Sequence, residues 1–374
     1  MSYAVDSSSR ASHLLSDCPL LPVDTTYSLN FRRKVLKQLH LSLYFSGISA
    51  LYGWTQSRIQ RKNAAIVLMY HSVPEASAAR WIDPCNRLSP VAFERQMKYL
   101  ASHRYVISID RLVQQLEQGE PIQPGTVAIT FDDGYLDNLT VAAPILAKYD
   151  LPATIYLPTN YIAAGENQWI DALYATFRSR SKHDLSLPEL GRWQLNHPSV
   201  IKQAYHHIAL HLVKETYPRR QEWLAKIDKQ LAPAASPPRL TMTWADIQQL
   251  QQQYPNITLG VHTASHLDLS THADKIEDEM TQSIHQLTAV TGDRPQHFAF
   301  PYNRYSLEAQ KRVAKYMRSA IAITPDRVVR DDTSPHELTR LEAPKSFTML
   351  KSWVDSGFPS LSQKLLGYSW TCPY

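Results

Sequence analysis

The sequence predicts an α/β fold in which helices connect the strands of a parallel sheet, either open or closed into a barrel. Apolar runs of strand length recur along the chain, and most are separated by segments whose apolar residues follow helical spacing. Strands that alternate with helices form parallel sheets, in which both faces of each strand are buried. The length of 374 residues suits a single barrel of about 250 residues with appendages.

The predicted strands are short runs of apolar residues. The first, residues 65–70, reads Ala-Ile-Val-Leu-Met-Tyr. The others, in chain order, are residues 127–131, 153–157, 257–261, 296–300 and 320–323. A continuous apolar run of this length is typical of a parallel strand that is covered on both faces.

Helices are predicted between these strands, at residues 91–102, 108–118, 138–149 and 273–290. Gly119 stands where it can end the second of them. In the last one, a shared face is formed by Ile276, Met280, Ile284 and Leu287. The alternation of strand and helix therefore continues almost to the end of the sequence.

Residues 169–248 interrupt this alternation. Their pattern is mostly helical with no clear strand, and a Pro-rich segment follows the helices at residues 232–238. We therefore expect a helical insertion at about residues 169–248, within an α/β domain of residues 63–345. Outside that domain we expect a flexible tail at residues 1–30, an N-terminal amphipathic helix at residues 31–62 and a C-terminal extension at residues 346–374.

Composition and charge limit the possible partners. The net charge of +5 is diffuse apart from two basic clusters within residues 32–37 and 58–62, so we expect no nucleic acid partner. The apolar stretch between them, residues 39–54, is shorter than the roughly 20 residues that span a bilayer. A helix at residues 31–62 could lie on a membrane surface or pack on the α/β domain, and the pattern leaves both open. The three widely spaced cysteines support neither a disulfide framework nor a cysteine metal site.

Two adjacent carboxylates follow the second predicted strand, in Thr130-Phe-Asp132-Asp133-Gly134. The carboxyl ends of parallel strands face the ligand crevice of α/β proteins. Neighbouring aspartates are costly to hold together as anions unless a cation compensates them. Taken alone, the motif could equally be a polar turn that caps the next helix.

Two histidines follow another predicted strand, in His262-Thr-Ala-Ser-His266. If this segment is one helical turn, both imidazoles project to the same side and can share a metal. Two His and one Asp leave a coordination position open, as in catalytic metal sites. A third segment, Phe298-Ala-Phe-Pro301-Tyr302-Asn303, ends a strand in what could otherwise be an ordinary turn.

Together these segments resemble the polysaccharide deacetylase family, also called the NodB-homology or carbohydrate esterase family 4 group. Residues 130–134 match its T-F-D-D-G motif, residues 262–266 its H-[ST]-x-x-H motif, and residues 298–303 a variant of its proline-aromatic motif. The resemblance covers residues 65–345 and favours the bacterial exopolysaccharide and cell-envelope members. It implies a distorted, partly open (β/α) barrel.

The resemblance also implies roles for individual residues. Asp133, His262 and His266 would hold a divalent metal, usually Zn²⁺ in the family, and Asp132 would be the general base. The backbone N–H of Tyr302, in the substrate-side motif that also contains Pro301 and Asn303, would stabilise the oxyanion. Trp169 with Asp171, and Trp244, fit aromatic positions near the substrate groove, although core packing is the favoured role of Trp244.

Two positions depart from the family pattern. Ala299 stands where many members have an arginine that orients the base; Arg340, on a late strand, could replace it or could be a surface residue. The family's late Leu-x-x-His motif, which supplies the general acid, is not recognisable after Ile323. We expect His71, at the end of the first strand, to donate the proton instead, with His336 as a second candidate. The alternative for His71 is a histidine that is simply hydrogen-bonded in place.

The predicted function is metal-dependent hydrolysis of N-acetyl groups from the amino sugars of a polysaccharide or lipid-linked glycan. The predicted location is the membrane surface of the bacterial cell envelope, on a side that the charge pattern does not choose. Two alternatives stay open. One is a hydrolase of another C–N amide bond, such as a formamide or cyclic imide, on the same barrel, and the other is a catalytically silent glycan-binding protein.

Overall fold

The computed structural model describes residues 64–323 and 328–356 of the chain. The predicted tail at residues 1–30 and the predicted amphipathic helix at residues 31–62 lie outside these residues, as does most of the predicted C-terminal extension. Within the described part, no helix combines the length and the apolar character needed to cross a bilayer.

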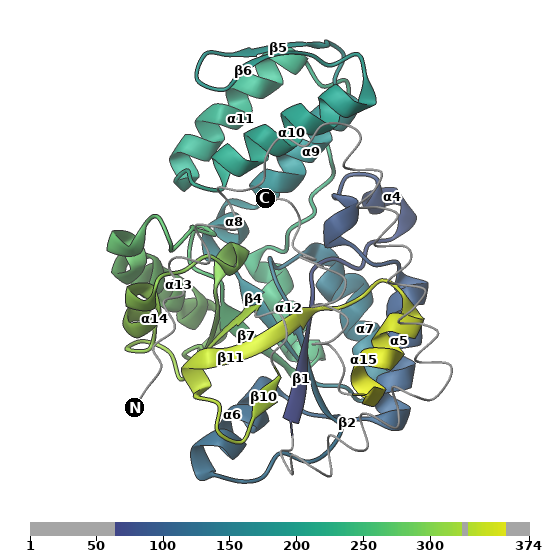
Figure 1. Ribbon diagram of the computed structural model, residues 1–374, viewed down its shortest axis with the longest axis vertical. Coiled ribbons are helices and arrows are strands. Elements are labelled where there is room, and N and C mark those ends of the chain that lie inside the picture. Colours follow the sequence, from purple (N-terminus) through teal and green to yellow (C-terminus); the bar gives the residue numbers. More distant parts are fainter. Residues whose placement is uncertain (1–63, 324–327, 357–374) are drawn as a thin grey trace.

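Seven parallel strands of the described residues form a closed ring (Figure 1). In order around the ring they are β1 (Ala64–Tyr70), β3 (Thr126–Phe131), β4 (Ala153–Leu157), β7 (Ile257–Val261), β8 (His297–Ala299), β9 (Ser319–Ile323) and β11 (Leu338–Glu342). The ring closes because β1 pairs with β11 on one side and with β3 on the other. The predicted (β/α) barrel is thereby confirmed. It is distorted between β7 and β8, which share a single register pair, Val261 with Phe298.

Two short strands extend the sheet beyond the ring. β2 (Tyr105–Val106) lies beside β3, and β10 (Val329–Arg330) runs antiparallel to β1. Helices surround the ring (Figure 1): α4 (Ala76–Ala79), α5 (Pro90–His103), α6 (Ile109–Gln118), α7 (Ala143–Lys148), α8 (Thr159–Ala164), α12 (Trp244–Gln253), α13 (Ile276–Thr291), α14 (Leu307–Val313) and α15 (Phe347–Ser356).

The helix boundaries follow local sequence signals. The predicted helices at residues 91–102 and 108–118 are α5 and α6, and each starts at a serine, Ser89 or Ser108, whose hydroxyl accepts a backbone N–H of the first turn. Gly119 ends α6 in a left-handed conformation, as predicted. The segment predicted as one helix at residues 138–149 begins with a π turn, η2 (Asn138–Ala142), and continues as α7.

Alternate residues of each strand point into the barrel or outwards to the helices. On β3, Ile129 and Phe131 belong to the main hydrophobic cluster with the helices, whereas Ala128 belongs to a smaller cluster with Tyr156. Asp132 continues the inward series and so reaches the mouth of the barrel. The interior is tightly filled: a Cβ atom on Gly260 would lie 2.5 Å from the Tyr156 ring, so only glycine leaves room for that ring.

The insertion between α8 and α12 forms a lobe of its own beyond the barrel (Figure 1). It contains α9 (Trp169–Ser179), the hairpin strands β5 (Asp184–Leu187) and β6 (Gly191–Gln194), α10 (Pro198–Leu212) and α11 (Tyr217–Leu231). Its buried residues form a separate hydrophobic cluster. The expectation of no strand here was wrong. Each strand has only 4 residues, and Leu185 and Leu187 are the buried ones of β5, which is too short a pattern to stand out in the sequence.

Candidate metal centre

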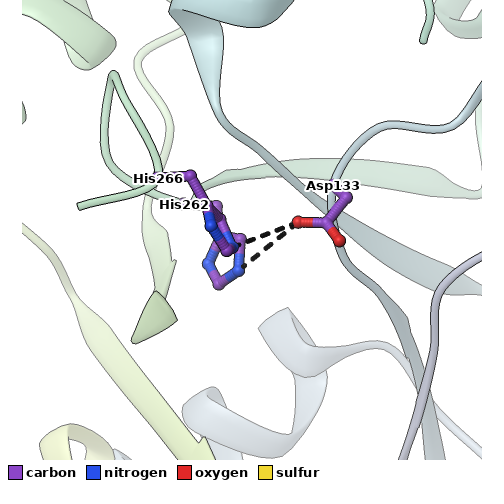
Figure 2. Close-up of side chains that lie close together, drawn as sticks. All are labelled: Asp133, His262 and His266. Carbon is purple, nitrogen blue, oxygen red and sulfur yellow. Dashed lines mark ion pairs between the residues drawn. The ribbon is translucent and has the colours of Figure 1, made fainter. Parts of the chain in front are cut away.

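Three side chains from two strand ends converge at the mouth of the barrel (Figure 2). Asp133 follows β3, and His262 and His266 follow β7; their ligand atoms lie within 4.8 Å of one another, and all three residues are buried. The Oδ1 atom of Asp133 is 3.2 Å from Nε2 of His266 and 3.9 Å from Nε2 of His262. Two ligand atoms on a tetrahedral zinc ion are about 3.3 Å apart, because each lies about 2.0–2.1 Å from the metal. One cation can therefore bridge the three atoms.

The backbone at this site adopts left-handed conformations that residues with a side chain rarely take. Seven non-glycine residues among those described have a positive φ, and five of them lie in the three sequence motifs. They are Asp133 (φ 72°), Thr263 (60°), His266 (53°), Tyr302 (54°) and Asn303 (58°). Such strain persists only where the surrounding structure holds it, and it gathers at functional sites.

The segment from His262 to His266 is not a helical turn, so the expectation that helical spacing would align its two imidazoles was wrong. Thr263 and His266 are both left-handed, and the segment is an irregular loop. The two rings nevertheless converge, with 4.7 Å between their centroids. The left-handed conformations of Thr263 and His266 thus bring the imidazole rings of His262 and His266 together without a helical turn.

His262 is oriented by a hydrogen bond on the far side of its ring. Its Nδ1 atom donates to the carbonyl oxygen of Ala299 at 2.7 Å, which leaves the lone pair of Nε2 facing Asp133. Burial lowers the pKa of His262 to about 4, although the Asp132 carboxylate opposes this. The imidazole is therefore neutral at neutral pH, as a metal ligand has to be.

Asp133 completes a donor set that suits a divalent cation. Its buried Oδ1 atom has no hydrogen-bond partner in the described part of the chain, and it faces the Nε2 atoms of the two histidines. Burial raises the pKa of Asp133, but the contacts with His266, together with the attraction of His71 and His262, outweigh it and hold that pKa below its ordinary value. One carboxylate oxygen and two imidazole nitrogens match the ligands that Zn²⁺ takes in proteins, and three protein ligands leave a position open.

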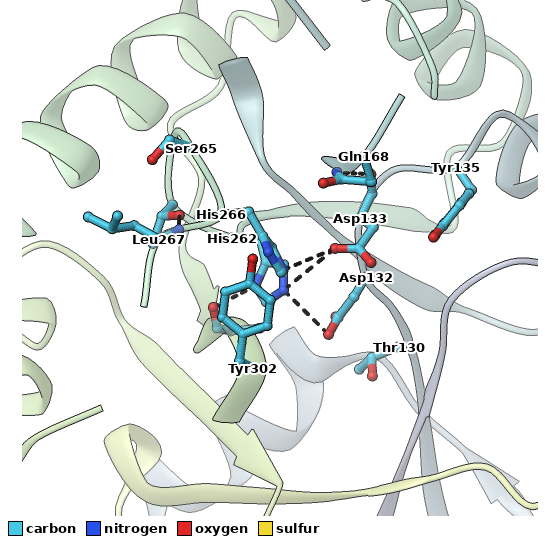
Figure 3. Close-up of polar contacts among 12 residues, drawn as sticks. Thr130, Asp132, Asp133, Tyr135, Gln168, His262, Ser265, His266, Leu267 and Tyr302 are labelled. Carbon is cyan, nitrogen blue, oxygen red and sulfur yellow. Dashed lines mark hydrogen bonds and ion pairs between the residues drawn. The ribbon is translucent and has the colours of Figure 1, made fainter. Parts of the chain in front are cut away.

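Asp132 lies beside this group and is held by Arg340. The guanidinium donates from Nη1 to Oδ1 at 2.7 Å and from Nη2 to Oδ2 at 2.5 Å. Both side chains are almost completely buried, with 4% and 2% exposure, so Arg340 is not a surface residue. Burial raises the pKa of Asp132, but the charge and hydrogen bonds of Arg340, together with the attraction of His262 and His71, outweigh it and hold that pKa below its ordinary value. The Oδ2 atom is 3.6 Å from Nε2 of His262, and Figure 3 shows Asp132 beside the ligand group.

The third motif forms one wall of the site. The Tyr302 ring packs edge-on against His266 with 4.3 Å between centroids, and its hydroxyl accepts a hydrogen bond from Nε1 of Trp169 at 2.6 Å. Asn303 lines the same cavity as Tyr302, whereas Pro301 is buried. Trp169 is only 1% exposed, so it belongs to the cavity wall and offers little surface to a sugar. Trp244 packs half-buried against the main hydrophobic cluster, as favoured from the sequence.

The two histidines proposed as proton donors lie in different places. His71, just after β1, lines the cavity that also contains Asp132 and the three ligand residues. His336 belongs to η5 (Pro335–Glu337), which precedes β11 and so lies at the amino end of that strand. Its Nε2 atom is bonded to the carbonyl oxygen of Met317 at 2.8 Å. The structure therefore brings His71 to the site and leaves His336 away from it.

The sequence did not single out Arg220, on α11 of the insertion. This arginine is fully buried, and its Nη1 atom donates to the carbonyl oxygens of Ser265 and His266, each at 3.0 Å. Its guanidinium also lies over the rings of Trp169 and Tyr302, at 5.5 and 5.8 Å from their centroids. The insertion therefore supports the histidine loop directly. An arginine in a charged helix normally indicates a solvated face, and no signal in the sequence marked this one.

Two further side chains brace the ligand loops. Gln168 donates from Nε2 to the backbone carbonyl of Asp133 at 3.2 Å. Glu279, on α13, accepts hydrogen bonds from the backbone N–H and the hydroxyl of Ser265 at 2.8 and 2.6 Å. Partners of this kind fix the orientation of metal ligands.

A barrel that gathers two histidines and two aspartates at the carboxyl ends of its strands has the place and the ligand types of a catalytic metal site. The sequence model of the family described as polysaccharide deacetylase matches residues 119–320, which is more than half of the chain. The chain belongs to the polysaccharide deacetylase family, a family of hydrolases.

Individual relatives agree with this family. YxkH of Bacillus subtilis strain 168, whose name places it among the polysaccharide deacetylases, is 35% identical over 92 residues. That match covers 24% of this chain and 30% of YxkH, so it spans less than a third of the relative.

Two solved structures share the fold. The deacetylase PplD of Streptococcus pyogenes, solved in complex with acetate, has a TM-score of 0.50 and 17% identity, over 78% of this chain and 97% of that one. IcaB of Ammonifex degensii has a TM-score of 0.52 and 15% identity, over 79% and 97% of the two chains. At these identities the likeness concerns the fold alone.

Proposed function

We propose that this chain hydrolyses N-acetyl groups from the amino sugars of a polysaccharide or lipid-linked glycan, with a divalent cation, Zn²⁺, as cofactor. The observation that carries this proposal is the convergence of Asp133, His262 and His266 beside a second aspartate that is held by Arg340 and lies outside the ligand set. Membership of the polysaccharide deacetylase family supports the substrate class.

Asp133, His262 and His266 would hold the cation. When bound there, a divalent metal lowers the pKa of a water molecule to about 7 and polarises the acetyl carbonyl group. The choice of Zn²⁺ rests on the two nitrogen donors and one oxygen donor, since Mg²⁺ and Ca²⁺ prefer oxygen ligands.

Asp132 would act as the general base. Its low pKa keeps it ionised, and the bidentate contact with Arg340 fixes its orientation towards the cavity. It would take a proton from the water that attacks the acetyl carbon. The backbone N–H of Tyr302, on the opposite wall beside His266, would donate to the oxygen that becomes negatively charged.

The nitrogen of the amide leaves as an amine and needs a proton. The sequence assigned this step to His71, which lines the cavity on the β1 side. The products would then be acetate and the free amino sugar.

Acetate release by the metal-loaded chain tests this function. Substrates with chitin-like, peptidoglycan-like and poly-N-acetylglucosamine structures should distinguish the glycan class, with Asp132→Asn as the inactive control. Release of formate or of a ring-opened imide without acetate would favour a hydrolase of another C–N amide bond. Binding of these glycans without hydrolysis by the metal-loaded chain would favour a silent glycan-binding protein.

We also propose that residues 31–62, which lie outside the described part, bring the enzyme to the membrane surface of the bacterial cell envelope. The two basic clusters on either side of an apolar stretch support this. Sedimentation with anionic vesicles should depend on these residues. A chain lacking residues 1–62 that sediments equally well would contradict the proposal.

A further inference from the structure

A carboxyl group that the mechanism above does not use lies in the active-site cavity. Glu342 ends β11, two residues after Arg340, so both side chains point to the same side of the strand. Glu342 lines the cavity that contains Asp132 and the three ligand residues. It also lines a smaller neighbouring cavity, with His71 and Cys85.

The side chain of Glu342 has no hydrogen bond or ion pair with any residue that the structure describes, although the residue is half-buried. The charged groups nearby are engaged elsewhere: Arg340 donates both of its Nη atoms to Asp132, and Lys345 donates to the carbonyl oxygen of Pro84. An ionised carboxylate in such a position lacks compensation. Burial raises the pKa of Glu342 to about 8, with a smaller rise from Cys85 and an opposing effect of Lys345. The group therefore carries a proton at neutral pH.

Glu342 lies on the side of the barrel mouth that faces the two histidines. Around the ring, β11 and β1 are neighbours, and they stand across from β4 and β7. His262 and His266 follow β7, whereas Glu342 and His71 stand on the β11–β1 side. A substrate amide between the two sides would have the ligand group on one side and a protonated carboxyl on the other.

We propose that Glu342, and not His71, is the proton donor to the leaving amine. This inference rests on the proposed deacetylation. In the step, the C–N bond of the tetrahedral intermediate breaks and its electron pair stays on nitrogen. The Glu342 carboxyl donates its proton to that nitrogen, which gives the amine and acetic acid. Asp132 then releases to solvent the proton that it took from water, and Glu342 takes up a proton from solvent. The net change is amide plus water to amine plus acid.

The test compares two substrates that differ in their need for an acid. An amine leaves only after protonation, whereas the 4-nitrophenolate of 4-nitrophenyl acetate leaves without it. Glu342→Gln should lower kcat on an N-acetylglucosamine oligomer by about 100- to 10,000-fold and leave kcat on the ester within about 3-fold of wild type. Glu342→Asp, which keeps a titrating carboxyl, should retain more amide turnover than Glu342→Gln. His71→Ala is the matched comparison. We expect this variant to show no selective loss of kcat on the amide relative to the ester.

The pH profile gives a second readout. Because the donor has to be protonated, amide turnover should fall as pH rises through about 8, and this falling limb should be absent for the ester. The other titratable or charged groups that line one of the two cavities with Glu342 are Tyr70, His71, Cys85, Arg87, Asp132, Asp133, His262, His266, Tyr302, Arg340 and Lys345. Cys85→Ser should keep the falling limb, because the thiol contributes only a minor part of the raised pKa.

The outcomes separate this inference from the function on which it rests. Glu342 is not the donor if the wild type releases acetate from the glycan and Glu342→Gln does so equally fast. It is also not the donor if Glu342→Gln loses turnover of the amide and of the ester to the same extent. Loss of amide turnover in His71→Ala, with the ester spared, would transfer the role to His71. If the wild type with bound metal cleaves the ester and no N-acetyl sugar, the deacetylase proposal itself fails. Thermal unfolding of each variant excludes a folding defect.

Discussion

Asp132 and Asp133 are adjacent in the chain and face different partners. The left-handed backbone of Asp133 (φ 72°) turns the chain between them, so that Asp133 faces His266 while Asp132 meets Arg340. Two neighbouring carboxylates can therefore both stay ionised, because each has its own positive or metal-binding partner. One motif thus supplies both the proposed metal ligand, Asp133, and the proposed general base, Asp132.

Substitution of Asp132 should separate catalysis from metal binding. Asp132→Asn removes the base but leaves Asp133, His262 and His266 in place, so acetate release should fall by about 100- to 10,000-fold while the bound metal stays unchanged. Acetate release and metal content of the same preparation check this. A variant that loses its metal, or one that keeps full turnover, would show that Asp132 does not have the role of base.

Removal of Arg340 should destabilise the fold. Arg340→Met leaves the Asp132 carboxylate buried without its partner, which should cost about 3–5 kcal/mol in the free energy of unfolding measured in urea. Arg318→Met, which removes a half-exposed ion pair with Glu117, is the matched control and should cost about 1 kcal/mol or less. Equal losses in the two variants would contradict the assignment of Arg340 as the partner of a buried base.

At this scale the sequence singled out Asp132, Asp133, His262 and His266, because these residue types stand in recognisable motifs, and the structure brings the four side chains together. Arg340 could be proposed only as one of two alternatives, since a lone arginine on a strand carries no sign of where it points. Glu342 and Arg220 were not predicted at all. A charged residue at a strand end or in a polar helix is normally solvated, and only the folded structure reveals that Arg220 is buried and that Glu342 lines the cavity.

At the scale of elements, the insertion contributes to the site through two helices, α9 with Trp169 and α11 with Arg220. Arg220 on α11 binds the carbonyl oxygens of Ser265 and His266 and supports the ring of Tyr302. The loop that carries the histidines is therefore held on one side by the insertion and on the other by Glu279 of α13. Because the loop is strained, we expect its ligand geometry to depend on these contacts.

Arg220→Lys should weaken metal binding. A lysine keeps the charge but cannot reproduce the planar set of donors, so zinc affinity, measured by competition with a chromogenic chelator, should fall by about 10- to 100-fold. Arg219→Lys on the same helix is the control, since Arg219 is 44% exposed and pairs with Glu222 at the surface. Unchanged zinc affinity in Arg220→Lys would show that the insertion does not help to position His266.

Two elements differ from the prediction for physical reasons. The helical spacing of His262 and His266 suggested a turn, but their convergence is achieved by a loop with two left-handed residues, which no propensity rule anticipates. The hairpin β5–β6 is short and buries few residues, so its alternating pattern is lost among helices. The long periodic helix α13 and the continuous apolar strand β4 agreed with the sequence.

At the scale of the whole molecule, closure of the ring assembles the site. The motifs that follow β3 and β7 and the arginine on β11 are far apart in the chain, and they meet because inward-facing residues at the carboxyl ends of a closed barrel share one mouth. The alternation of strands and helices predicted the barrel. The place of the insertion could not be predicted, because the contacts that seat it, such as those of Arg220, join segments distant in sequence.

The proposal that Asp133, His262 and His266 hold one metal ion is tested most simply by a calorimetric zinc titration of the chelator-stripped chain. The titration is carried out on the wild type and on His266→Ala. We expect the wild type to bind one tight equivalent of zinc, with acetate release restored as that equivalent binds, and His266→Ala to lose at least about 100-fold in affinity. No binding to the wild type, or the same tight equivalent in His266→Ala, would contradict this proposal.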